Sequence, residues 1–180
     1  MSTFTHLDAS GNPSMVDVGA KPVTRRSATA RALVHLPESV LQHFETGEIR
    51  SKKGPVFQTA ILAGVMAAKR TGELIPLCHP LGLDHCQVTV ALNDLQEVVV
   101  ECTTTITAKT GVEMEALTGA SIAALTIYDM CKALSHAIVL GPAKLRGKRG
   151  GKRDFGDATG DISGEALSDN DAQRKKRGRG

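Results

Sequence analysis

The spacing of apolar residues predicts a sheet with four strands. In three of them apolar and polar residues alternate at period two, which places every second side chain on one face of a sheet. Asn93-Asp94 predicts a hairpin turn between two strands, and Gly141-Pro142 is expected to end the last one. The predicted strands cover residues 26–36, 86–92, 98–106 and 137–140.

Helices are predicted in the two regions between these strands. Pro37 opens a short helix that Gly47 is expected to end, and Gly54-Pro55 opens a longer helix that should end near Gly72. The longest helix is expected over residues 113–135, which are rich in Ala, Leu and Met. The order strand, helices, strand, strand, helix, strand predicts an α+β fold of the ferredoxin-like split βαβ type, with helices on one face of an antiparallel sheet.

Charge divides the chain into a body and a tail. Residues 144–180 hold 11 of the 22 Lys and Arg against six acidic residues, whereas the remainder holds 11 basic and 13 acidic residues. We therefore expect a catalytic domain over residues 1–145, with an N-terminal arm over 1–23, and a disordered basic tail over 146–180. The tail is suited to nonspecific contact with polyanions, but the body gives no electrostatic reason to expect nucleic-acid binding.

A proline-rich segment carries the first candidate site. Pro76 and Pro80 exclude a regular helix and are expected to hold residues 73–81 extended. Taken alone, the intervening His79 is interpreted as incidental to a rigid surface turn more readily than as a ligand contact. A metal site is disfavoured, because adjacent Cys-His pairs point apart on an extended chain and the spacing differs from a CxxC knuckle. That metal set would be Cys78, His79, His85 and Cys86.

Cysteine usage and the N-terminal sequence favour a cytoplasmic protein. The four cysteines form no CxxC pair, and the N-terminal residues lack a secretory pattern. No apolar run approaches the roughly 20 residues that span a bilayer. We therefore expect reduced thiols in a cytoplasmic environment.

A second candidate site lies on the longest predicted helix. Asp129 and Lys132 are i, i+3 neighbours in a stretch nearly devoid of other charges, so they are either a surface ion pair or part of a site. Burial beside Asp129 would make the pKa of Lys132 tunable. Glu115 differs from Asp129 by only about 40° around the helix and could share its face. Lys53, just ahead of a predicted helix start, is a candidate anion contact.

Together these segments resemble the cyclic pyranopterin monophosphate synthase family of molybdenum cofactor biosynthesis. The resemblance extends over about residues 3–153, and its last two blocks are long and specific. This sequence departs from the family at Pro55, a position where an acidic residue is common in the family. The matching segments are Met15–Val18, Lys53-Gly54, Ala67–Thr71, Leu74–Leu81, Lys109–Thr118 and Ala123–Lys132.

The resemblance implies a homohexamer, a trimer of dimers with sites at subunit interfaces, and no cofactor or metal. The implied substrate is 3′,8-cyclo-7,8-dihydroguanosine 5′-triphosphate, and the implied products are cyclic pyranopterin monophosphate and pyrophosphate. It assigns catalysis to Asp129, Lys132 and Lys53. It assigns substrate binding to Leu77, Cys78, His79, Met114 and Glu115, with Glu113, Lys69 and Asp17 nearby.

The implied chemistry suits these residue types. Ring opening, ring closure and cyclic phosphate formation need several proton transfers and no net oxidation, which lysines of lowered pKa can perform. Cationic side chains stabilise the charge that grows on departing pyrophosphate. An RNA-recognition module shares this topology, but it stacks bases on strand aromatics, which segments 86–92 and 98–106 lack. A scaffolding protein is the third alternative, which a turnover assay distinguishes.

Overall fold

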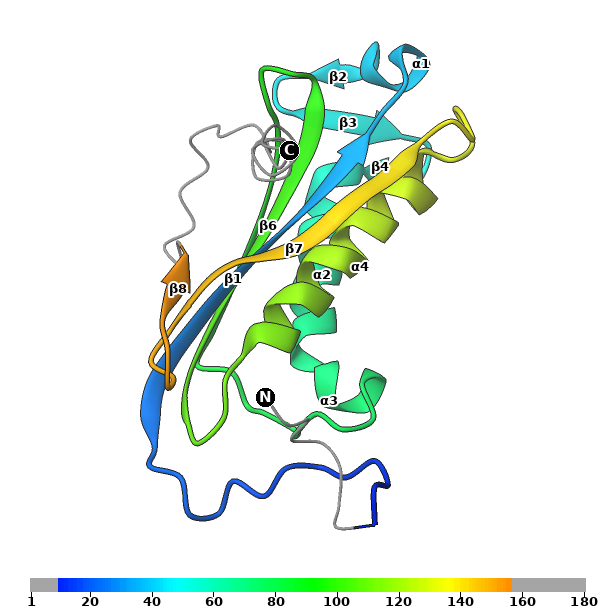
Figure 1. Ribbon diagram of the computed structural model, residues 1–180. Helices are drawn as coiled ribbons and strands as arrows, with labels where there is room; N and C mark the ends of the chain where they lie inside the picture. The colour runs from blue at the N-terminus through cyan, green and yellow to red at the C-terminus, as the bar shows by residue number, and fades with distance from the viewer. Residues whose placement is uncertain (1–9, 157–180) are drawn as a thin grey trace, which may run out of the picture.

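The computed structural model describes residues 10–156, in which two long helices cover one face of an antiparallel sheet (Figure 1). The five strands of this sheet follow the order β5-β6-β1-β7-β8. They are β1 (Thr24–His35), β5 (His85–Leu92), β6 (Glu97–Ala108), β7 (Val139–Arg149) and β8 (Phe155–Gly156). The helices are α1 (Glu38–Leu41), α2 (Val56–Lys69), α3 (Thr71–Leu74) and α4 (Glu113–Cys131). A small second sheet contains β2 (Phe44–Glu45), β3 (Glu48–Ser51) and β4 (Gly54–Pro55).

The predicted α+β class with its antiparallel sheet is confirmed. β1 lies between β6 and β7 and is antiparallel to both, the strand order expected of two interleaved βαβ units. Helices α2 and α4 pack against the same side of the sheet, which leaves its other side uncovered by helices (Figure 1). No helix of residues 10–156 is both long enough and apolar enough to cross a membrane.

Small residues let α4 lie close to the sheet and to α2. On β1 the residues that face the helices are mostly alanines, and Ala28 and Ala30 are completely buried. Gly64 and Gly119 meet where α2 and α4 cross, since a Cβ on Gly64 would stand 2.9 Å from the Gly119 carbonyl oxygen. A Cβ on Gly119 would stand 2.5 Å from Cys102 Sγ on β6. The position of α4 therefore depends on the absence of these two side chains.

The predicted role of Gly47 as a helix stop is wrong. Helix α1 already ends at Leu41, and the chain then forms the β2–β3 hairpin. Thr46 and Gly47 are the two central residues of its turn, with φ of 49° and 83°. Positive φ at both positions is the geometry of a type I′ turn, which matches the twist of a two-stranded ribbon.

Two further element boundaries differ from those predicted. Residues 73–81 are not wholly extended, because Glu73 and Leu74 belong to α3, whose turn closes through Ile75 N–H to the Thr71 carbonyl before Pro76 is reached. The segment around residues 75–78 is a turn. Helix α4 ends at Cys131, four residues earlier than predicted.

The C-terminal strand continues well beyond Gly141-Pro142. A register shift in the β1–β7 ladder between Ala32 and Val34 accommodates these two residues, and at that point β7 has only β1 as a partner. An edge position tolerates a proline because its missing N–H is not needed. The expected loss of order after residue 145 is therefore wrong for residues 146–149 in β7 and 155–156 in β8. The rest of the predicted tail, 157–180, and residues 1–9 of the arm lie outside the described residues.

Candidate active site

Three of the predicted site residues meet at the C-terminal end of α4. Lys53, in the turn between β3 and β4, places its Nζ 2.7 Å from Asp129 Oδ2 and 3.0 Å from the Asp129 carbonyl oxygen. Lys132 places its Nζ 2.8 Å from Asp129 Oδ1. One carboxylate thus joins two ammonium groups from segments far apart in sequence. All three side chains are about half exposed, so a ligand can reach them.

The Lys53–Asp129–Lys132 triad favours the charged forms of Asp129 and Lys132. Hydrogen bonds from Lys132 and then from Lys53 lower the pKa of Asp129 to about 2, so the carboxylate is ionised at neutral pH. The same hydrogen bond from Asp129 raises the pKa of Lys132. The expectation of a lowered Lys132 pKa is therefore wrong in the single chain, because the amine is exposed and paired rather than desolvated. Lys132 is therefore a cation at neutral pH.

The second group of predicted residues lines a cavity of about 580 Å³ at the other end of α4. The turn that closes through Cys78 N–H to the Ile75 carbonyl presents the Leu77-Cys78-His79 segment to this cavity. The first turn of α4 contributes residues from the opposite side. The predicted residues that line the cavity are Leu77, Cys78, His79, Glu113, Met114 and Glu115.

Two carboxylates in this cavity have different surroundings. Glu115 is only 3% exposed, and its burial raises the pKa of its carboxyl group. Burial, with Glu115 nearby, also raises the pKa of the Cys78 thiol, which disfavours a thiolate there. Glu113, by contrast, forms an ion pair with Lys148 of β7 at 2.7 Å. Burial thus favours the protonated form of Glu115, whereas the carboxylate of Glu113 is paired with an ammonium group.

Lys69 and Asp17 lie near this cavity but do not line it. Lys69 lines a smaller adjoining hollow, which shares Leu81 and Glu115 with the cavity. Asp17 Oδ1 accepts a hydrogen bond of 2.7 Å from Gly19 N–H and so shapes a local turn of the arm. Its neighbours in the arm, rather than Asp17 itself, line the cavity.

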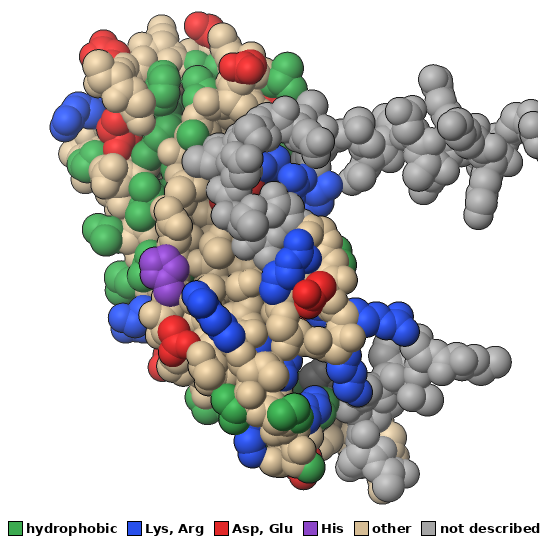
Figure 2. Space-filling view, turned by 90° about the vertical axis from the view of Figure 1, so that its left-hand side faces the viewer, with side chains coloured by type: hydrophobic (Ala, Val, Ile, Leu, Met, Phe, Trp, Pro, Cys, Tyr) green, Lys and Arg blue, Asp and Glu red, His purple; other side chains and the backbone are tan. Residues whose placement is uncertain are grey.

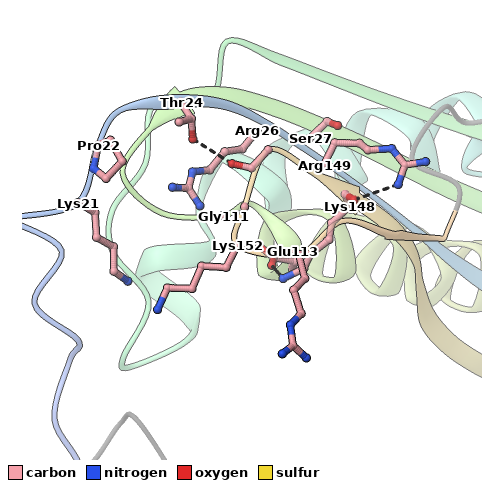
Figure 3. A pocket seen from close by; sticks show the side chains of 13 residues that line it. Lys21, Pro22, Thr24, Arg26, Ser27, Gly111, Glu113, Lys148, Arg149 and Lys152 are labelled. Carbon is pink, nitrogen blue, oxygen red and sulfur yellow. Dashed lines mark hydrogen bonds and ion pairs between the residues drawn. The ribbon is translucent and has the colours of Figure 1, made fainter.

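A strongly basic pocket of about 640 Å³ adjoins the cavity and was not predicted. Figure 2 shows Lys and Arg side chains gathered around a hollow on this face, and Figure 3 shows Lys21 and Lys152 extending into the pocket from different segments. Among residues 10–156, the one acidic residue that lines this pocket is Glu113, which is already paired with Lys148. Its cationic lining residues are Lys21, Arg26, Lys148, Arg149, Lys152 and Arg153. Such a pocket is suited to a multiply charged anion.

A sequence signal for part of this pocket was available. Lys144, Arg146 and Lys148 alternate with Leu145 and Gly147, which is the period-two pattern of a strand. The charge of this stretch instead favoured its interpretation as a tail. β7 carries these residues along the sheet, and Lys148 and Arg149 line the pocket.

The two parts of the site are far apart within one chain. Glu115 and Asp129 are 14 residues apart on α4, which corresponds to about 21 Å along the helix axis. Their similar direction around the helix therefore does not bring them to one ligand. In Figure 1, α4 runs from an end near α3 to an end near β3 and β4. Its first turn lines the cavity, and Asp129 of the triad lies near its other end. Within residues 10–156, no three His, Cys, Asp or Glu side chains come together as a metal site.

The fold and these clusters define a ferredoxin-like protein whose site is cationic and suited to a small anionic ligand. A family model for the MoaC family matches residues 15–151, and the chain belongs to this family. A cyclic pyranopterin monophosphate synthase of Xanthomonas campestris pv. campestris (strain 8004) is 56% identical over 86% of this chain and 94% of its own length. The synthase of Xanthomonas axonopodis pv. citri has the same identity and coverage.

Relatives with longer chains also match. The molybdenum cofactor biosynthesis bifunctional protein of Synechocystis sp. is 47% identical over 84% of this chain and 45% of its own length. Molybdenum cofactor biosynthesis protein 1 of Dictyostelium discoideum is 45% identical over 83% of this chain and 26% of its own length. The same unit thus occurs both alone and within larger proteins.

Proposed function

We propose that this protein is a cyclic pyranopterin monophosphate synthase that works in the cytoplasm. It converts 3′,8-cyclo-7,8-dihydroguanosine 5′-triphosphate to cyclic pyranopterin monophosphate and pyrophosphate, and it needs no cofactor. Membership of the MoaC family and the names of its relatives support this activity. The observation that carries the residue assignment is the Lys53–Asp129–Lys132 triad, in which one carboxylate holds two ammonium groups.

The ligand's charge and the pocket's charge are complementary. A nucleoside triphosphate carries several negative charges, and the basic pocket beside the Cys78–His79 cavity supplies cations from the arm, β1 and the β7–β8 turn. We assign the triphosphate to this pocket and the purine-derived rings to the adjoining cavity. There His79 and Glu115 contact the rings.

The reaction then needs proton transfers and a stabilised leaving group. Lys53 and Lys132 donate protons and stabilise the charge that grows on pyrophosphate, while Asp129 holds both ammonium groups in place. The buried carboxyl group of Glu115, with its raised pKa, exchanges protons with the opening ring. No electrons are gained or lost overall, so these acid–base groups are sufficient.

The separation along α4 supports a site shared between chains. A single small ligand cannot touch two clusters about 21 Å apart. We propose that the triad of one protomer meets the cavity of a neighbouring protomer in a homohexamer built as a trimer of dimers. Apolar side chains exposed on the outer faces of the helices, Leu62, Met66 and Leu125, supply surface for such contacts.

Release of pyrophosphate from the cyclised nucleotide tests the proposal directly. Wild-type protein should release it and form the cyclic monophosphate, whereas Lys53→Ala should assemble normally and form no product. Lys52→Ala is the matched control, since Lys52 is the exposed neighbour in the same turn and should leave turnover near the wild-type rate. Normal turnover by Lys53→Ala would remove Lys53 from the catalytic group, and an inactive wild-type protein would overturn the function.

A further inference from the structure

A glutamate outside the site described above bridges two elements next to Lys53. Glu48 is the first residue of β3, and its Oε1 accepts hydrogen bonds of 2.8 Å from both Ile49 N–H and Phe57 N–H. Its Oε2 accepts a hydrogen bond of 3.1 Å from Gln58 N–H. Both carboxylate oxygens are thus used, and together they join the start of β3 to the start of α2.

These bonds replace the cap that α2 lacks locally. Pro55 occupies the N-cap position and makes no side-chain capping bond. Phe57 and Gln58 lie in the first turn of α2, where backbone N–H groups have no partner within the helix. A carboxylate at this position satisfies those donors and also interacts favourably with the helix dipole. Glu48 supplies it from nine residues upstream of Phe57.

These bonds hold the elements on both sides of the turn that contains Lys53. Lys52 and Lys53 form the turn between β3 and β4, and β4 leads directly into α2. Within the turn, Ser51 Oγ accepts a hydrogen bond from Lys53 N–H and donates one to the Gly54 carbonyl. With β3 tied to α2 by Glu48, both ends of this turn are held against one helix start.

We propose that Glu48 is a positioning residue for Lys53. Glu48 holds the β3–β4 turn in the conformation in which the Lys53 amine reaches Asp129. The kinetic test of this proposal rests on the function proposed above. The claim that Glu48 fixes the position of the β3–β4 turn does not depend on that function. Glu48 need not touch substrate. It acts by fixing the turn's backbone, and a displacement of about 1 Å in a catalytic group can cost about 100-fold in rate.

Kinetics of Glu48 variants test the positioning role. Glu48→Ala should lower kcat by about 10- to 100-fold with KM within about twofold of wild type. Glu48→Gln keeps a carbonyl acceptor and should recover most of that loss. Glu48→Asp, whose carboxylate is one methylene shorter, should not recover it. The control is Glu45→Ala, since Glu45 is exposed on β2 directly opposite Glu48 and should leave kcat unchanged.

Hydrogen exchange followed by mass spectrometry provides a readout independent of turnover. Amides of residues 52–58 should exchange faster in Glu48→Ala and Glu48→Asp than in wild type or Glu45→Ala. If Glu48→Ala fails to fold, Glu48→Asp decides the outcome.

The failures of the two proposals are distinguishable. An inactive Lys53→Ala together with a Glu48→Asp that matches Glu45→Ala in kcat and in exchange would overturn the positioning role alone. An active Lys53→Ala would overturn the catalytic role of Lys53 and the kinetic part of the positioning proposal, while hydrogen exchange would still decide its geometric part.

Discussion

Mixing two inactive variants should restore activity if each site is shared between protomers. Lys53→Ala removes one amine of the triad at the C-terminal end of α4, and His79→Ala removes the imidazole of the cavity at its N-terminal end. The distance of about 21 Å between these ends means that one chain cannot supply both groups to one ligand. Each variant alone therefore lacks one half of every site.

The expected recovery follows from counting subunits. A composite site is intact only when its triad comes from a His79→Ala chain and its cavity from a Lys53→Ala chain. Each condition holds for half of the subunits in an equal mixture, so about a quarter of the sites should be complete after random exchange. The remaining sites lack one or both groups.

Coexpression of the two variants with different affinity tags gives the mixed assembly. Pyrophosphate release by the doubly purified protein should approach this fraction of the wild-type rate. A mixture of Lys53→Ala with Asp129→Asn is the matched control, because both changes fall in the same half-site and should give no recovery. Absence of activity in the Lys53→Ala and His79→Ala mixture, with mixed assemblies present, would refute the shared site.

Packing and pH provide two further predictions. Gly119→Ala should lower the free energy of unfolding by about 2 kcal/mol, since a Cβ 2.5 Å from Cys102 Sγ places the overpacking cost near the upper end of about 1–3 kcal/mol and alanine's helix propensity returns about 1 kcal/mol. In denaturant titrations the loss should shrink in a Cys102→Ala background, and stability equal to that of Gly82→Ala, which places its Cβ in open space, would contradict it. Asp129 has a pKa lowered from 3.8 to about 2 on folding, so its stabilising contribution is complete above pH 3.8 and is lost as pH falls through about 2. The gap between the unfolding temperatures of wild type and Asp129→Asn should therefore narrow between about pH 4 and pH 2, and a gap constant over this range would be inconsistent with the pairing.

Elements with a strong local pattern were predicted well from sequence. The alternation over residues 26–36 and 86–106 corresponds to β1, β5 and β6, because one face of each strand is buried beneath a helix. Gly54-Pro55 and the alanine-rich stretch after Glu113 mark α2 and α4 within a few residues. The strands contain both the periodicity and a breaker just beyond it, whereas no glycine or proline marks the end of α4 at Cys131.

Features that depend on distant partners were not predictable in this way. The sequence around Gly47 is equally compatible with a helix end and with a hairpin turn. Only the pairing of Phe44 with Ile49 distinguishes these two structures. The basic pocket combines Lys21 with residues more than 120 positions away in the chain. Within the site, local spacing indicated the Asp129–Lys132 pair, whereas the contact with Lys53 crosses 76 residues. Such contacts are decided by tertiary packing rather than by local pattern.

The course of β7 matters for any attempt to shorten this protein. The chain after residue 145 has few aromatic residues and many charged ones, so it resembles a tail that could be removed without loss. A stop codon placed there would delete Lys148, leave Glu113 without its cation, and remove four of the six cationic residues that line the basic pocket. Trimming for crystallisation or expression should therefore start after residue 156, where β8 is complete.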